Sequence, residues 1–177
     1  MPPVGLMMKN RCDGVCASIR GSALNSKEKA KIEAKLEFLL RAIEQLQQAL
    51  PAQRQDYERD WRAQKVVERL CQEIVECCLD INLLIAQRIA HTTPQSGREG
   101  FAILRRREVI SEHVQQVFQQ SYIGFRNLPV HVYDQIDAVA SYYTARRLIF
   151  DAQTYVGEIH QFLDAPGDTD VAEDGSA

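Results

Sequence analysis

The chain has 177 residues, of which 45% are hydrophobic and 25% are charged, and its net charge is -3 at pH 7. A chain of this size buries roughly 70% of its unfolded surface, so it is long enough to fold as one domain without disulfide bonds. The small negative charge argues against broad, non-specific binding to nucleic acid, because such binding needs an extended basic surface. Any contact with nucleic acid is therefore expected at a local basic patch.

The cysteines and the apolar stretches bear on where the protein works. There are five cysteines, an odd number, and three of them (Cys71, Cys77 and Cys78) fall on one apolar helical pattern. A secreted disulfide framework usually has an even number, so a reducing cytoplasm fits better. No stretch approaches the ~18 consecutive apolar residues of a membrane span, and residues 1–8 are too short and too weakly apolar for a signal peptide. We therefore expect a cytoplasmic protein with no membrane partner.

Two long helices are predicted in the first half of the chain. Residues 1–25 lack a sustained period and are expected to form a disordered or loosely attached extension. A helical stripe then begins at Lys27, with Ser26 as the expected N-cap, and Pro51 ends it. After a polar stretch with room for a short turn, a second stripe predicts a helix from Trp61 to Ala90. The apolar positions of the two stripes recur every three or four residues: Ile32, Leu36, Leu39, Ile43, Leu46 and Leu50, then Val67, Leu70, Ile74, Cys77, Ile81, Leu84 and Ile89.

The second half of the chain is also helical in pattern. Residues 91–100 are rich in loop-forming types, and residues 101–107 predict a short helix. Ser111 is expected to cap a further helix, and a last long helix is predicted over residues 136–163. Residues 164–177 are acidic, have no apolar period and are expected to be a disordered tail.

These elements predict an all-α fold: an antiparallel bundle of about four long helices plus one or two short ones, in a single domain over residues 26–163. No segment shows the period-two alternation that is typical of a strand.

The segment from residue 124 to residue 134 carries the most informative polar groups. Arg126, His131 and Tyr133 lie within eight residues, among apolar neighbours. On a regular helix Arg126 and Tyr133 share a face, whereas His131 lies about 140° away from Arg126. Pro129 disfavours a regular helix at this point. A kink, or a two-fold dimer axis, would bring the three groups together.

Such a group suits the cleavage of RNA without a metal. Arginine is a permanent cation whose planar fork matches phosphate, and histidine exchanges protons near neutral pH. His131 would take the proton of a ribose 2′-hydroxyl, while Arg126 would stabilise the charged phosphorus-centred transition state. Spacing alone leaves a plainer interpretation open, in which Arg126 pairs with an acidic neighbour and His131 and Tyr133 are packed core residues.

Other candidate sites are weaker. Four carboxylates on the second helix, Glu68, Glu73, Glu76 and Asp80, are typical of di-metal bundles, but these also need Glu-x-x-His pairs, which the sequence lacks. We therefore expect no metal and no cofactor. The run Arg105–Arg107 is either a solvated face or the local patch that meets a phosphate backbone.

The motif segment resembles a known family. Arg126-x4-His131-x-Tyr133, within Gly-Phe-Arg-Asn-Leu-Pro-Val-His-Val-Tyr-Asp, is similar to the motif of the HepT proteins, a branch of the HEPN superfamily. The stretches at residues 67–70 and 78–81 are similar to the long second helix of that family. The resemblance covers residues 26–163, although Pro129 stands where an ordinary helix former is more usual.

The resemblance implies a function. HepT proteins are toxins of toxin-antitoxin pairs, and their partner is a minimal nucleotidyltransferase (MNT) antitoxin. They form homodimers whose two motifs face each other in a cleft, and their assigned activity is metal-independent endoribonuclease cleavage. The antitoxin inactivates them by transferring AMP from ATP to the motif tyrosine. By this resemblance Arg126 and His131 are catalytic, Tyr133 is the modified residue, and Asn127 and Asp80 are supporting residues.

Two alternatives stay open at this point. The protein could be a non-catalytic partner subunit that presents nucleotide or substrate to a nucleotidyltransferase. It could also be a bare helical dimerisation module, in which substitutions at Arg126 and Tyr133 would have no effect.

Overall fold

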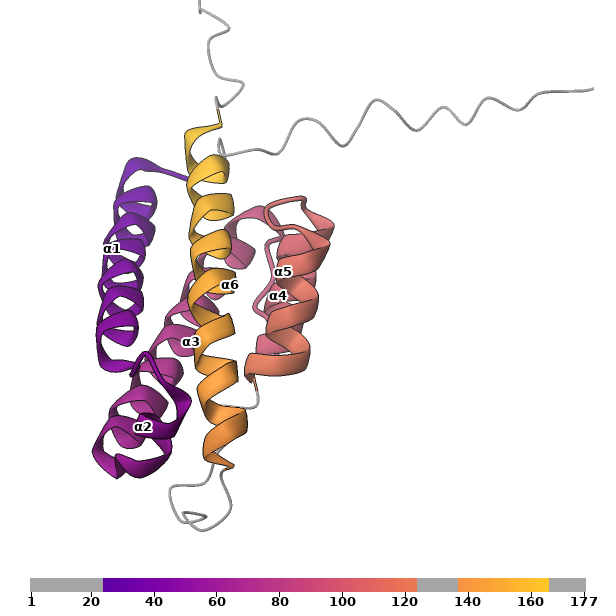
Figure 1. Ribbon diagram of the computed structural model, residues 1–177. Helices are drawn as coiled ribbons and strands as arrows, with labels where there is room; N and C mark the ends of the chain where they lie inside the picture. Colours follow the sequence, from indigo (N-terminus) through magenta and orange to yellow (C-terminus); the bar gives the residue numbers. More distant parts are fainter. Residues whose placement is uncertain (1–23, 124–136, 166–177) are drawn as a thin grey trace, which may run out of the picture.

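The computed structural model describes residues 24–123 and 137–165, and these residues form a helical bundle without strands (Figure 1). Three helices are long, and the others are short. The elements in chain order are α1 (Ser26–Ala49), α2 (Arg54–Arg59), α3 (Trp61–Ile89), α4 (Gly97–Arg106), α5 (Glu112–Val117), the π-helical turn η1 (Phe118–Tyr122) and α6 (Ala138–Asp164). The predicted all-α class is confirmed.

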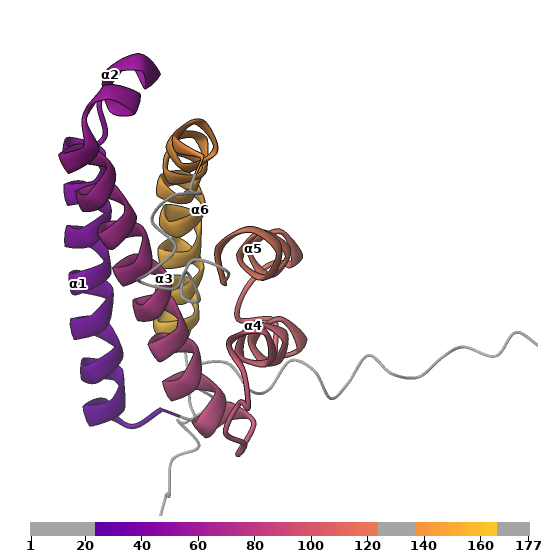
Figure 2. The ribbon, with the colours of Figure 1, turned by 90° about the horizontal axis from the view of Figure 1, so that it is seen from below.

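The long helices α1, α3 and α6 pack on one another, and α1 runs in the opposite direction to the other two (Figure 1). Contacts at both ends of α1 establish this direction. Near its start, Glu28 forms an ion pair with Arg88 of α3 at 2.7 Å. Just beyond its end, the carbonyl of Ala52 accepts a hydrogen bond from Tyr142 of α6 at 2.9 Å. The shorter helices α4 and α5 lie on the far side of α3 and α6 from α1 (Figure 2).

The N-cap of the first helix lies one residue earlier than expected. Asn25 is the N-cap: its side chain accepts a hydrogen bond from the Glu28 amide at 2.9 Å, and the Glu28 carboxylate accepts one from the Asn25 amide at 3.1 Å. This reciprocal capping box needs Glu or Gln three residues after the cap. Asn25 satisfies that spacing, whereas the third residue after Ser26 is Lys29. The expected cap at Ser26 is therefore wrong, while the helix itself is confirmed.

The long helix α3 agrees closely with its predicted limits. Asp60 caps it by accepting hydrogen bonds from the amides of Arg62 and Ala63 at 2.9 and 3.2 Å. Its cysteines, Cys71, Cys77 and Cys78, are buried and free. Burial raises the pKa of the Cys71 thiol to about 12 and that of Cys77 to about 11. They are packing residues, since the thiolate is the reactive form.

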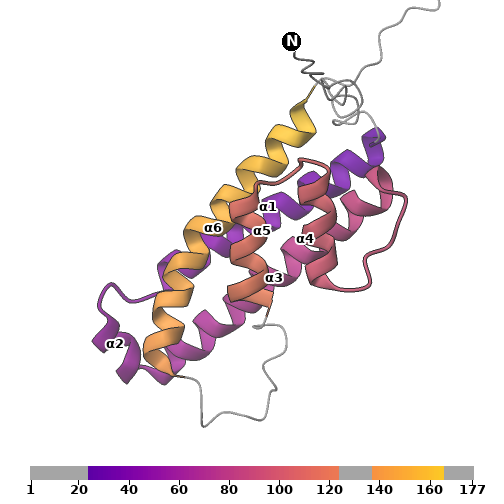
Figure 3. The same ribbon diagram turned by 90° about the vertical axis from the view of Figure 1, so that its right-hand side faces the viewer.

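An aromatic core joins the short helices to α6. The rings of Phe101 and Phe118 stack with 4.9 Å between their centroids. The ring centroids of Tyr122 and Tyr155 lie 5.2 and 5.7 Å from that of Phe118. Ser111 caps α5 as expected, by accepting a hydrogen bond from the amide of Val114. In Figure 3, α5 lies between α4 and α6. The α5–η1 unit thus brings the chain against the middle of α6, where Tyr155 lies.

Within residues 24–123 and 137–165, no helix is both long enough and apolar enough to cross a lipid bilayer.

Candidate functional site

The four motif residues, Arg126, Asn127, His131 and Tyr133, lie in residues 124–136, outside the part of the chain that the structure describes. Their roles therefore remain predictions. The disorder expected at the two ends of the chain also remains a prediction, because residues 1–23 and 166–177 lie outside the described part too. The structure does describe the two points from which this segment starts and to which it returns. These are the end of η1, at Tyr122 and Ile123, and the start of α6, at Asp137.

The entry to the segment is anchored in the core. The Tyr122 side chain has no exposed surface, and its hydroxyl donates a hydrogen bond of 2.5 Å to Oδ2 of Asp151 on α6. Burial, followed by the hydrogen bond and the charge of Asp151, raises the pKa of Tyr122 far above its ordinary value. The phenol is therefore protonated and acts as a donor. Tyr122 lies only four residues before Arg126, so this bond fixes the position of the chain just before the motif segment.

The same carboxylate lies near an imidazole. Nε2 of His113 on α5 is 3.5 Å from Oδ1 of Asp151, and the Asp151 residue is only 7% exposed. A carboxylate this deeply buried needs such partners, since an unpaired charge in the core is costly. Spacing along the chain does not predict this contact, because it joins two helices whose residues share no local motif.

The return of the segment is also fixed. Asp137 caps α6 by accepting a hydrogen bond from the amide of Val139 at 2.8 Å. One turn later, Ser141 is 3.0 Å from the hydroxyl of the buried Tyr57 on α2, and Tyr142 donates to the carbonyl of Ala52. The start of α6 is thus held against α2 and the α1–α2 link. The motif segment spans two points that the core holds in place.

Asp80 is the only predicted site residue that falls within the described ranges. It lies on α3, where its carboxylate forms an ion pair of 2.7 Å with Lys35 of α1. The side chain of Asp80 is 59% exposed, so this pair contributes about 0–1 kcal/mol at most. Its predicted supporting role is not tested by this contact.

Two other carboxylates of α3 have local partners. Glu68 pairs with Lys65 at 3.0 Å, and Glu73 pairs with Arg69 at 2.8 Å. Among the residues that the structure describes, no group of three or more His, Cys, Asp or Glu side chains is arranged to hold a metal ion. The Arg105–Arg107 run lies at the end of α4, where positive charge stabilises the helix dipole. Its role as a phosphate patch remains a prediction.

Comparison with solved structures concerns the fold. The tri-AMPylated HEPN toxin of Shewanella oneidensis, solved in complex with an MNT antitoxin, matches 78% of this chain and 99% of its own, with a TM-score of 0.67 and 22% identity. A cytosolic protein of unknown function from Bacillus subtilis matches 76% of this chain and 89% of its own, with a TM-score of 0.61 and 21% identity. At these identities the likeness concerns the fold alone, which is all-helical in the part of the chain that the structure describes.

Sequence comparison identifies the family. The model of the HepT-like ribonuclease family matches residues 39–159, and the chain belongs to this family. A curated relative, the tRNA nuclease HepT of Aphanizomenon flos-aquae (strain 2012/KM1/D3), is 28% identical over 133 residues, which are 75% of this chain and 89% of the relative. The resemblance to HepT toxins is confirmed, and so is the expectation that this protein is an enzyme of the ribonuclease class.

Proposed function

We propose that this protein is the toxin of a HepT/MNT toxin-antitoxin pair: a metal-independent endoribonuclease that its antitoxin neutralises by transferring AMP to Tyr133. The observation that carries the proposal is the family match over residues 39–159, since it includes the whole Arg126–Tyr133 motif and both of its anchors. The Aphanizomenon relative is named a tRNA nuclease, which supports RNA as the substrate class.

Arg126 and His131 are the proposed catalytic residues. His131 removes the proton of a ribose 2′-hydroxyl, whose oxygen then attacks the adjacent phosphorus and displaces the 5′-oxygen of the next nucleotide. Arg126 binds the non-bridging phosphate oxygens, on which negative charge develops. General acid-base help of this kind contributes roughly 10²–10⁴-fold to the rate. Asn127, next to Arg126, and Asp80 are proposed as supporting residues.

Tyr133 is the proposed point of control. An AMP group on its hydroxyl would add bulk and negative charge two residues from His131, and it would compete with RNA phosphate for Arg126. The Shewanella toxin is described as tri-AMPylated and in complex with an MNT antitoxin, which supports a minimal nucleotidyltransferase as the partner of this protein too. We further propose a cytoplasmic homodimer in which the two motif segments face each other across a cleft.

The test is cleavage of RNA by the purified protein in the presence of EDTA. The wild type is expected to cut RNA and to arrest growth when expressed without its antitoxin, and His131→Ala is expected to do neither. His160→Ala is the matched control, because His160 is an exposed histidine on α6 and should retain full activity. Equal activity in His131→Ala would remove the mechanism. Tight binding to the nucleotidyltransferase with no RNA cleavage by the wild type would favour a non-catalytic partner subunit instead.

A further inference from the structure

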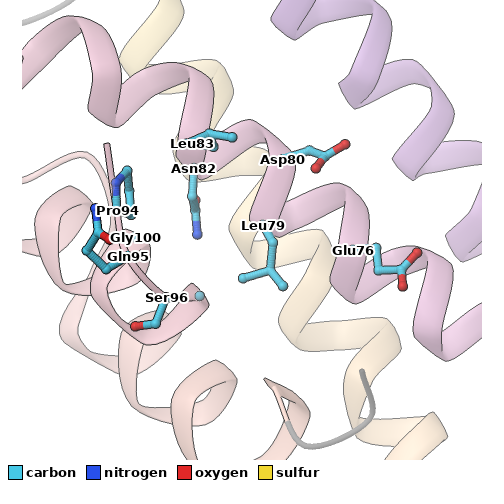
Figure 4. Close-up of a pocket in the computed structure, with 10 residues that line it drawn as sticks. Glu76, Leu79, Asp80, Asn82, Leu83, Pro94, Gln95, Ser96 and Gly100 are labelled. Atoms are coloured by element: carbon cyan, nitrogen blue, oxygen red, sulfur yellow. The ribbon is translucent and has the colours of Figure 1, made fainter. Parts of the chain in front are cut away.

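A pocket of about 430 Å³ lies between the middle of α3 and the start of α4 (Figure 4). It is separate from the two anchors of the motif segment. Its walls come from α3 and from the stretch of chain that leads into α4. The residues that line it are Glu76, Leu79, Asp80, Asn82 and Leu83 of α3, with Pro94, Gln95, Ser96, Gly97 and Gly100 of the α3–α4 link and α4.

Asn82 is the unusual residue of this pocket. It is 1% exposed, and its Oδ1 is 2.9 Å from the hydroxyl of Tyr155 in the core. Its Nδ2 is buried without a hydrogen-bond partner among the described residues, and the side chain points between Leu79 and the start of α4 (Figure 4). A buried polar atom without a partner destabilises a fold. An amide kept there is explained if a ligand completes its hydrogen bonding.

The amide leaves one polar atom toward the pocket in either orientation. If it is rotated by 180°, Nδ2 donates to the Tyr155 hydroxyl, which can then donate to the carbonyl of Cys78 at 3.2 Å. In that case Oδ1 faces the pocket without a partner. The group that binds Asn82 therefore has to offer either an acceptor for Nδ2 or a donor for Oδ1, because the two orientations of an amide are close in energy until a partner selects one.

Two glycines let the start of α4 lie close to this amide and to Leu79. A Cβ at Gly100 would lie 3.4 Å from Cβ of Asn82 and 3.9 Å from the ring of Pro94, and a Cβ at Gly97 would lie 2.6 Å from Cδ2 of Leu79. Glycine is a poor helix former, yet it occupies two positions in the first turns of α4. The bare backbone at these positions forms one wall of the pocket, and a side chain at Gly100 would take up space beside Asn82.

The charges and the apolar walls select among ligands. A phosphate would suit the start of α4, but the carboxylates of Glu76 and Asp80 at the same pocket disfavour an anion. Leu79, Leu83 and Pro94 offer flat apolar contact instead. A nucleobase is uncharged and planar, and it carries donors and acceptors next to each other on its edge.

We propose that this pocket binds a nucleobase, whose edge hydrogen-bonds to the unpartnered atom of the Asn82 amide and whose faces contact Leu79, Leu83 and Pro94. The proposal rests on the proposed function only for its biological role, which is to hold an unpaired base of the RNA substrate. Its physical basis is the buried amide facing an open pocket.

Free nucleosides test this without RNA cleavage. Adenosine, guanosine, cytidine and uridine carry no phosphate, so their binding needs no anion site. We expect at least one of them to bind to the full-length protein, and NMR titration measures this binding. Gly100→Ala is expected to weaken that binding roughly fivefold to tenfold. This is the loss expected when the added methyl group displaces the nucleobase from one hydrogen bond. Gly157→Ala is the matched control, because its Cβ would meet nothing within 4 Å and it gives α6 the same gain in helix propensity.

Each outcome bears on the proposal. Thermal unfolding first confirms that Gly100→Ala folds, and Asn82→Ala is a second variant that removes the amide itself. The proposal is overturned if no nucleoside binds, or if both variants bind as the wild type does. Loss of antitoxin binding in Gly100→Ala, without any nucleoside binding, would assign the pocket to a protein partner and also overturn it. Titrating His131→Ala separates the two proposals, since an inactive protein that still binds nucleosides retains this one.

Discussion

The Tyr122 hydroxyl donates a hydrogen bond of 2.5 Å to the buried carboxylate of Asp151, which joins the end of η1 to the middle of α6. This bond ties the start of residues 124–136 to the helix that follows them. The motif that we propose cleaves RNA therefore follows a point held by the core. A rigid start is useful to a catalytic segment, because small displacements of catalytic groups reduce rates strongly.

Removing this hydroxyl should destabilise the fold measurably. Tyr122→Phe removes this hydrogen bond and leaves the Asp151 carboxylate with the more distant His113, so we expect a loss of about 1–3 kcal/mol in the free energy of unfolding. Urea denaturation at pH 7 measures it. Tyr143→Phe is the control, because Tyr143 is 54% exposed and should change stability by less than about 0.5 kcal/mol. Equal stability of the two variants would mean that the bond does not hold the segment.

The buried thiols of α3 predict a loss of stability in alkaline solution. The pKa of Cys71 rises to about 12 and that of Cys77 to about 11, from an ordinary value of 9.0, because burial disfavours the thiolate. In the unfolded chain these thiols ionise above pH 9, whereas in the folded protein they keep their protons. Their contribution to stability is therefore fully present below pH 9 and falls as the pH rises toward 11–12.

Urea denaturation between pH 7.5 and about 10.5 measures this dependence. The free energy of unfolding should fall with pH, and Cys71→Ala, although less stable at pH 7.5, should give a shallower slope above pH 9. An identical slope in the wild type and in Cys71→Ala would show that this thiol titrates alike in both states.

A pair of substitutions separates the two roles of Asp80. Asp80→Asn and Lys35→Met both break the same exposed ion pair, so each should cost about 0–1 kcal/mol of stability. If Asp80 supports catalysis as proposed, Asp80→Asn lowers RNA cleavage and Lys35→Met does not. Cleavage rates measured at equal protein concentration decide this. Rates that are equal in the two variants would reduce Asp80 to an ion-pair residue of the α1–α3 contact.

The sequence predicted the long helices well, because each of them repeats a signal many times. The stripes of α1 and α3 have an apolar residue at every third or fourth position, and the limits predicted for α3, Trp61 to Ala90, differ from the observed ones by one residue. The cap of α1 was wrong because a single position carries little information. Only the pairing of Asn25 with Glu28 distinguishes it from Ser26.

The contacts around the site could not be predicted from spacing. Tyr122 and Asp151, like Asn82 and Tyr155, lie on different helices, and their contact depends on how those helices pack. Local periodicity shows which face of a helix is buried, but not which polar residues meet across the core. Glycines at positions 97 and 100 are likewise unremarkable in the sequence, and their effect is visible only against Leu79 and Asn82.

The most direct test follows RNA cleavage before and after treatment with the nucleotidyltransferase and ATP, with EDTA added for the cleavage step. We predict that the untreated protein cuts RNA, that treatment adds AMP to its intact mass and abolishes cleavage, and that Tyr133→Phe neither gains mass nor loses activity. Tyr143→Phe should behave as the wild type, since Tyr143 lies on α6 outside the motif. An unchanged mass of the wild type, or AMP addition that leaves RNA cleavage intact, would contradict the account.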